Sequence, residues 1–274
     1  MTTIQAIVLG VIQGLTEFLP VSSSGHLVLF SRLFNVQQSS LVFEVMVHVG
    51  TLLAVLVVFR REVWLLIRSF FRLLRNPRDA KNQMKHDPGC RLLVALIVGT
   101  VPTVIAALVL RNQIEELFSS SLFVGFMLLV TGTILYVTER HKTTTKPLDK
   151  ISLRDGILIG LGQAVAMLPG ISRSGTTIAA GLFRGLDRES AARFSFLLAI
   201  PAILGALVLS IGDLFSGTAQ IGLGILGAGF IAAALTGYLA IHFLLDLVKR
   251  GKLVWFSYYT WIVGALVIIL HVVS

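Results

Sequence analysis

Two stretches of this 274-residue chain decide how it folds. Residues 13–26 read QGLTEFLPVSSSGH, and residues 163–176 read QAVAMLPGISRSGT. They lie in two apolar regions, 1–40 and 155–193, which are interrupted by proline, glycine and serine. Because proline and glycine break helices, neither region is expected to form one straight membrane-spanning helix.

The rest of the chain is predicted to span a membrane. Hydrophobic residues make up 55% of the sequence, charged residues only 14%, and the mean hydropathy is +0.87. A soluble domain carries about 25% charged residues, so this composition argues against a soluble enzyme, a disordered chain and a nucleic-acid-binding module. A spanning helix needs about 20 apolar residues. Six stretches qualify, at 41–59, 92–110, 121–138, 194–211, 221–247 and 253–273.

The basic residues predict which loops face the cytoplasm. Four segments, 60–91, 139–155, 184–193 and 248–252, hold 20 of the 23 lysines and arginines. Since lysine and arginine are retained on the cytoplasmic side, these segments are expected to be inside. The formal net charge of +9 is therefore interpreted as a signal of membrane topology and not of nucleic-acid binding.

Once the six predicted spans are placed between these inside loops and the outside loops, neither interrupted region can cross the membrane completely. Region 155–193 begins and ends inside, whereas region 1–40 begins and ends outside, so each is predicted to enter the membrane and return. The predicted fold is an all-α polytopic membrane protein with six transmembrane helices plus two re-entrant helical hairpins. Both termini are expected outside.

The two interrupted regions also resemble each other, which predicts an internal repeat. An offset of 150 aligns Gln13 with Gln163, Ser22 with Ser172, Ser24 with Ser174 and Gly25 with Gly175, and an offset of 151 aligns Phe43 with Phe194 and Leu53 with Leu204. The chain is interpreted as one integral membrane domain, 1–274, with repeat 1 at about 1–138, an inside loop at 139–154 and repeat 2 at about 155–274. Because the hairpins enter from opposite faces, the repeat has inverted topology and the hairpin tips can meet near the midplane.

The residues at the tips favour a site for a phosphate group. Irregular backbone at membrane depth must be buried in protein or line a wet cavity, and ionisable residues there are functional candidates. Arg173 offers a planar fork that binds phosphate oxygens bidentately, and the neighbouring hydroxyls add donors. His26 can exchange a proton near neutral pH. Glu17 can orient that histidine or hold a divalent cation.

Each of these residues also has a purely structural interpretation. Serine and glycine in membrane helices usually allow close packing. Glu17 could pair with Arg173, and His26 could be a hydrogen-bonded buried histidine. Glu44 and His48, spaced i and i+4, could be half of a metal site but are more often a structural contact.

Other residues are expected to have structural roles. Five aromatic residues are expected at the membrane interfaces: Trp64, Trp255, Trp261, Tyr258 and Tyr259. The single cysteine, Cys90, excludes an internal disulfide framework and a multi-cysteine metal site.

Both motifs closely resemble those of the bacterial undecaprenyl-diphosphate phosphatases of the BacA/UppP type, and the similarity covers the whole chain. The resemblance implies a multi-pass enzyme of the bacterial cytoplasmic (inner) membrane. It implies removal of the terminal phosphate of undecaprenyl diphosphate, which recycles the lipid carrier for peptidoglycan synthesis. It also implies bacitracin resistance and dependence on a divalent cation, Mg²⁺ or Ca²⁺.

The resemblance assigns roles to individual positions. Gln13 and Glu17 fill a Glu/Gln-x₃-Glu pattern, and Gln13 leaves Glu17 as the only carboxylate of that motif. The candidate catalytic residues are Glu17, Ser23, His26 and Arg173; the candidate substrate-binding residues are Gln13, Ser22, Ser24, Ser172, Ser174 and Thr176; the candidate metal ligand is Glu17.

Several alternatives stay open from the sequence. The nucleophile could be Ser23 with His26 as its base, His26 itself, or a water molecule. A transporter or flippase for an anionic lipid headgroup would also suit an inverted repeat. The expected partners are a polyprenyl diphosphate lipid and membrane lipids, with no nucleic acid, and a homodimer is compatible with the sequence.

Overall fold

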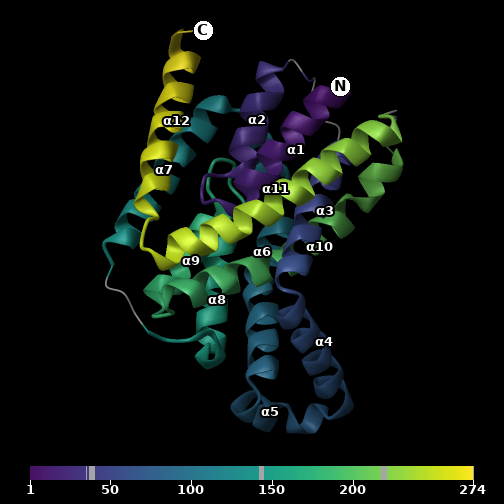
Figure 1. Ribbon diagram of the computed structural model, residues 1–274, viewed down its shortest axis with the longest axis vertical. Helices are drawn as coiled ribbons and strands as arrows, with labels where there is room; N and C mark the ends of the chain where they lie inside the picture. Colours follow the sequence, from purple (N-terminus) through teal and green to yellow (C-terminus); the bar gives the residue numbers. More distant parts are fainter. Residues whose placement is uncertain (35, 37–40, 142–144, 217–220, 274) are drawn as a thin grey trace.

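Figure 1 shows the computed structural model, which describes residues 1–34, 36, 41–141, 145–216 and 221–273. The described residues form helices joined by short turns, with no β-strand among them. The α-helices are α1 (Thr3–Phe18), α2 (Ser23–Leu33), α3 (Leu41–Val58), α4 (Arg60–Arg75), α5 (Ala80–His86), α6 (Pro88–Leu117), α7 (Ser121–Glu139), α8 (Leu153–Val165), α9 (Arg173–Phe183), α10 (Arg188–Ser216), α11 (Leu223–Lys249) and α12 (Val254–Val273). Two short 3₁₀ helices, η1 (Pro77–Asp79) and η2 (Leu148–Lys150), lie in the connections.

Among the described residues, five helices are long and apolar enough to cross a membrane: α6, α7, α10, α11 and α12. A sixth candidate is α3, which passes the same test only together with α4, a helix bent away from it by 87°. Each of the six predicted spans falls on one of these helices. The all-α, polytopic membrane class predicted from the sequence is therefore confirmed, with five to six candidate spans.

The basic segment 60–91 is largely helical, whereas the sequence analysis treated it only as an inside loop. Apolar residues recur in it every three or four positions, at Trp64, Ile67, Phe71 and Leu74, and this spacing places them on one face of α4. Arginines fill much of the rest of the helix. In Figure 1, α4, α5 and the start of α6 extend together from one end of the molecule, and the start of α1 and the end of α12 lie toward the other end.

Both interrupted regions form a helix, a break and a second helix. In the first, Pro20 follows α1, and Ser22 has a φ of 70° before α2 begins. In the second, Pro169 follows α8, and Gly170 has a φ of 96°. Proline cannot continue either helix because it lacks the N–H group and clashes with the preceding turn. The residue with positive φ is two positions after the proline in the first break and one position after it in the second. The two prolines are 149 residues apart, one fewer than the offset of 150 that aligns the rest of the motifs.

The repeat extends to the caps of the first helices. Thr2 caps α1 in a capping box with Gln5, and Ser152 caps α8 in a capping box with Asp155. Both pairs obey the offset of 150 that aligns the two motifs. Each box satisfies backbone N–H groups at a helix start, so the two halves begin with the same local hydrogen-bond pattern.

The helices pack in a reciprocal way. Helix α1 packs along α11, α8 packs along α6, and α7 pairs with α12 (Figure 1). Glycines allow the first two contacts, because a Cβ atom at Gly10 would collide with the carbonyl oxygen of Gly229, and one at Gly160 with that of Gly99. Gly10 and Gly160 are again 150 residues apart. This close approach of backbones is typical of small residues between membrane helices.

Candidate active site

A small cavity lies where the two breaks meet. Its volume is about 150 Å³, and polar residues from both motifs line it. The lining residues are Thr16, Glu17, Ser23, Ser24, His48, Phe118, Ala166, Met167, Ile171, Ser172 and Arg173. The structure thus brings together Glu17, Ser23, Ser24, Ser172 and Arg173 of the predicted site residues.

Glu17 is the central residue of this cavity. It lies near the end of α1, is 7% exposed, and accepts hydrogen bonds from three side chains. The Gln13 amide, one turn earlier on α1, donates to Oε2 at 3.0 Å, and the Ser23 hydroxyl donates to the same oxygen at 2.5 Å. The Arg173 guanidinium forms an ion pair with Oε1. Glu17 therefore joins the first motif to the second.

Ser23 and Arg173 occupy equivalent positions in the two halves. Each is the first residue of the helix that follows a break, α2 for Ser23 and α9 for Arg173. The start of a helix exposes unpaired backbone N–H groups and favours an anion nearby. The Ser23 hydroxyl and the Arg173 guanidinium therefore reach Glu17 from two helix starts, and the same two donors suit a phosphate group.

The flanking serines order the two breaks. Ser172 caps α9 by accepting from the Gly175 N–H at 3.1 Å, and Ser22 accepts from the Gly25 N–H at 3.3 Å. The Ser22 and Ser24 hydroxyl oxygens are 3.3 Å apart, and those of Ser172 and Ser174 are 3.2 Å apart. Ser174 also donates to the carbonyl of Leu19 at 3.2 Å, so it connects the second break to the first.

Five predicted residues are not part of the cavity lining: Ser22 and Ser174, described above, and Gln13, Thr176 and His26. The Gln13 amide group reaches Glu17, but its amide oxygen is buried and has no hydrogen-bond partner among the described residues. The hydroxyl of Thr176 is likewise buried without a partner in the described part of the chain. His26 lies behind the cavity and is 3% exposed.

The contacts of His26 differ from those expected of a base for Ser23. Its Nδ1 lies 2.8 Å from the carbonyl oxygen of Ser22, and its Nε2 lies 2.8 Å from the hydroxyl of Tyr259 on α12. Because a carbonyl can only accept, Nδ1 carries a proton, and in the neutral ring Nε2 then accepts from Tyr259. The two rings are stacked with centroids 5.6 Å apart. Tyr259, predicted as an interfacial anchor, therefore contacts a motif residue, and Ser23 donates to Glu17 instead of His26.

Sequence reasoning underestimated His48. Its Nε2 lies 3.9 Å from Oε2 of Glu17, and the ring lines the cavity. Nδ1 lies 2.8 Å from the backbone carbonyl of Glu44, one helical turn earlier. One signal was available, since His48 and Glu44 are the two ionisable residues of the predicted span 41–59. Phe118 gave no signal, because only the fold brings the end of α6 to the site.

The described residues fit a resident divalent cation poorly. No group of three or more His, Cys, Asp or Glu side chains lies close enough to hold a metal ion in the described part of the chain. Glu17 is the carboxylate of the cavity, and its charge is already compensated by Arg173. Hard cations prefer several oxygen ligands, so Glu17 alone does not make a cation site.

Comparison with known proteins places the chain in a family. Residues 6–266 match the family model described as "Bacitracin resistance protein BacA". Proteins named undecaprenyl-diphosphatase are 44% identical in Carboxydothermus hydrogenoformans, over 99% of this chain and 98% of the relative, and 47% identical in Methanobrevibacter smithii, over 97% of both. A third, in Desulfosudis oleivorans, is 48% identical over 96% of this chain and 97% of the relative. This chain therefore belongs to the BacA family.

Proposed function

We propose that this protein hydrolyses undecaprenyl diphosphate to undecaprenyl phosphate and inorganic phosphate in the bacterial cytoplasmic membrane. The relatives' name supports this substrate, and one observation in the site supports this chemistry: Glu17 accepts hydrogen bonds from both Ser23 and Arg173. A carboxylate, a hydroxyl and a guanidinium are the groups that a phosphoryl transfer needs for proton removal, attack and charge stabilisation. Recycling of the lipid carrier for peptidoglycan synthesis, and bacitracin resistance, follow from the same activity.

In the proposed reaction, Ser23 attacks the terminal phosphorus while its proton passes to Glu17. A new bond forms between Ser23 Oγ and phosphorus as the bridging P–O bond breaks, and undecaprenyl phosphate leaves. Glu17 then gives this proton to the solvent and takes one from a water molecule that attacks the phosphoserine. The bond between phosphorus and Ser23 Oγ breaks, Glu17 returns the proton to Oγ, and inorganic phosphate leaves. Arg173 transfers from Glu17 to the phosphate and stabilises its charge. Direct attack by a water molecule that Glu17 activates would use the same residues.

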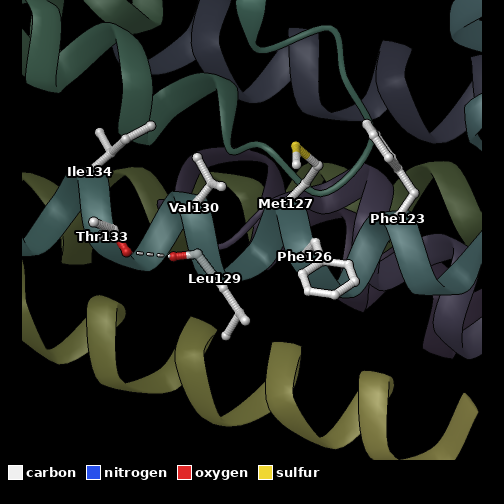
Figure 2. Close-up of a pocket in the computed structure, with 7 residues that line it drawn as sticks. All are labelled: Phe123, Phe126, Met127, Leu129, Val130, Thr133 and Ile134. Carbon is white, nitrogen blue, oxygen red and sulfur yellow. Dashed lines mark hydrogen bonds between the residues drawn. The ribbon is translucent and has the colours of Figure 1, made fainter. Parts of the chain in front are cut away.

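The apolar tail of the substrate has a candidate place beside this cavity. A groove of about 610 Å³ runs along α7. Figure 2 shows the residues that line it: Phe123, Phe126, Met127, Leu129, Val130, Thr133 and Ile134. The groove borders the second break, because a Cβ atom at Gly170 would lie 2.7 Å from Cβ of Met127. Ile171 and Ser172, the next residues, line the catalytic cavity. A polyprenyl chain in the groove would thus have its diphosphate near Arg173.

The reciprocal packing supports the inverted-topology repeat that the sequence predicts. Helix α1 packs on α11 as α8 packs on α6, and the two broken segments meet at the cavity. We propose that α1–α2 and α8–α9 are re-entrant hairpins entering from opposite faces, and that α3 is the sixth span. In such repeats the broken segments of both halves build one shared site.

The activity is tested by phosphate release from undecaprenyl diphosphate with purified full-length protein in detergent. Wild-type protein is expected to release phosphate, and Glu17→Gln to lose about 10²–10⁴-fold in kcat, the usual contribution of a general base. Movement of the lipid across proteoliposome membranes without phosphate release would instead support a carrier. The cation expected from the resemblance stays a prediction, which assays with and without EDTA examine.

A further inference from the structure

His48 presents a nitrogen to the catalytic cavity, and the reaction derived above leaves this nitrogen unused. Its Nδ1 is fixed by the backbone carbonyl of Glu44 at 2.8 Å, so Nδ1 carries a proton and the ring has one orientation. Nε2 is then the nitrogen that faces Glu17, at 3.9 Å from Oε2. That distance is too long for a direct hydrogen bond.

The two histidines near the site differ in accessibility. The His48 side chain is 37% exposed and lines the cavity, whereas His26 is buried and its Nε2 already accepts from Tyr259. A ligand entering the cavity therefore meets the imidazole of His48 before that of His26. His48 belongs to α3 and Arg173 to α9, so the two side chains reach the cavity from different elements.

The cavity is small enough that a bound phosphate would lie close to His48. Its volume of about 150 Å³ corresponds to about five water molecules at the density of the liquid. A phosphate, with five non-hydrogen atoms, occupies a comparable share of this space. A phosphate held by Arg173 therefore lies within reach of the other polar groups of the lining.

We propose that His48 is a substrate-contacting residue whose Nε2 hydrogen-bonds the terminal phosphate alongside Arg173 and Ser23. The proposal rests on the phosphatase function proposed above. The hydrogen bond between Nε2 of His48 and the phosphate can form whichever of the two carries the proton. An imidazolium donates to a phosphate oxygen, and a neutral Nε2 accepts from a protonated phosphate oxygen.

The proposal is tested with His48→Phe, which keeps a ring but removes the polar nitrogen, and His48→Gln, which keeps a donor. A matched control is His86→Phe, because His86 is exposed on α5 in the remote basic extension. For each purified protein, kcat and KM are measured with undecaprenyl diphosphate as the substrate. Binding affinity is measured separately with methylenediphosphonate, a diphosphate analogue that cannot be hydrolysed. His48→Phe is expected to weaken analogue binding and raise KM about ten- to a hundredfold, as for a lost hydrogen bond to a charged group.

His48→Gln is expected to retain analogue affinity within about threefold of wild type, since one donor satisfies a single hydrogen bond. His86→Phe is expected to match wild type. Equal analogue affinity in His48→Phe and His86→Phe would overturn the proposal, as would a lower melting temperature in His48→Phe without a change in affinity. His48→Met replaces the Phe variant if the latter does not fold. Because analogue binding is measured without turnover, failure of wild type to release phosphate would refute the proposed activity and leave the His48 test intact.

Discussion

At the scale of single residues, Arg173 must exchange one anion for another. It is paired with Glu17 in the structure and has to engage phosphate during the reaction. Arg173→Lys keeps the charge but loses the planar fork, so we expect kcat/KM to fall at least about thirtyfold, equivalent to about 2 kcal/mol. The control is Arg154→Lys, since Arg154 is exposed at the start of α8.

Two results would point to a structural role for Arg173 instead. One is near-normal turnover by Arg173→Lys. The other is recovery of thermal stability by the Glu17→Gln/Arg173→Gln double variant after a loss in each single variant. A pair that serves only the fold shows such coupling, because each single change leaves a buried charge without its partner.

The bond between His26 and Tyr259 gives a second residue-scale prediction. Tyr259→Phe removes the hydroxyl that is hydrogen-bonded to Nε2 of His26. The control is Tyr258→Phe, because Tyr258 is 45% exposed and Tyr259 is 44% exposed. We expect Tyr259→Phe to lower the free energy of unfolding by about 1 kcal/mol. We also expect it to reduce kcat, because His26 bonds to the carbonyl of Ser22, next to the nucleophile Ser23. Tyr258→Phe should change neither. If His26 acts only through its own ring, kcat stays unchanged in Tyr259→Phe and falls in His26→Ala alone.

These residues also show which parts of the site could be predicted from the sequence. The two motifs predicted that Glu17, Ser23 and Arg173 would meet, because the predicted topology and repeat place the two breaks near each other. Tyr259 could not be placed, since 233 positions separate it from His26 and an aromatic residue near a span end already had an interfacial explanation. His48 was visible as an ionisable residue in an apolar span, but periodicity alone does not say which way it faces.

At the scale of elements, the fit of α8 against α6 depends on glycine. A methyl group at Gly160 would collide with the carbonyl of Gly99, whereas one at Gly205 on α10 meets no atom within 4 Å. We expect Gly160→Ala to lower the melting temperature and to displace the second break, with loss of activity. Gly205→Ala should leave activity intact and add up to about 1 kcal/mol of stability, because alanine favours a helix more than glycine. Equal melting temperatures for the two variants would contradict this packing.

The elements were predictable to different degrees. The six apolar stretches mark helices because a long uncharged segment has few alternatives in a membrane. Helix α4 was missed because segment 60–91, which holds nine lysines and arginines, was interpreted only for charge. Its apolar residues recur at helical spacing and form one face of the helix, on which Trp64 and Phe71 are exposed. Counting the charges alone does not reveal this face.

At the scale of the whole molecule, charge and geometry together predict which side the site opens to. The basic extension of α4 and α5 lies at one end, and the start of α1 and the end of α12 lie toward the other (Figure 1). Helix α6 begins in that extension, and Phe118, just beyond its last residue, lines the cavity. If lysine and arginine mark the cytoplasmic face, the cavity lies toward the outer end of α6.

Single cysteines test this arrangement in a Cys90→Ser background. In intact cells, a membrane-impermeant thiol reagent should label Ser120→Cys, between α6 and α7, and should reach Lys81→Cys on α5 only after permeabilisation. Labelling of position 81 in intact cells, or its absence at position 120, would reverse the predicted sidedness.

The same reagent can report on the cavity itself. Met167 lines it at the position that matches Glu17 in the second half, and Met167→Cys leaves the hydrogen bonds of Glu17 in place. We expect slow labelling of Met167→Cys in intact cells, because the residue is half-buried, and slower labelling still with methylenediphosphonate in the medium. Protection at 167 but not at 120 would follow from a diphosphate occupying the cavity from outside. Labelling only after permeabilisation would mean that the cavity opens to the cytoplasm.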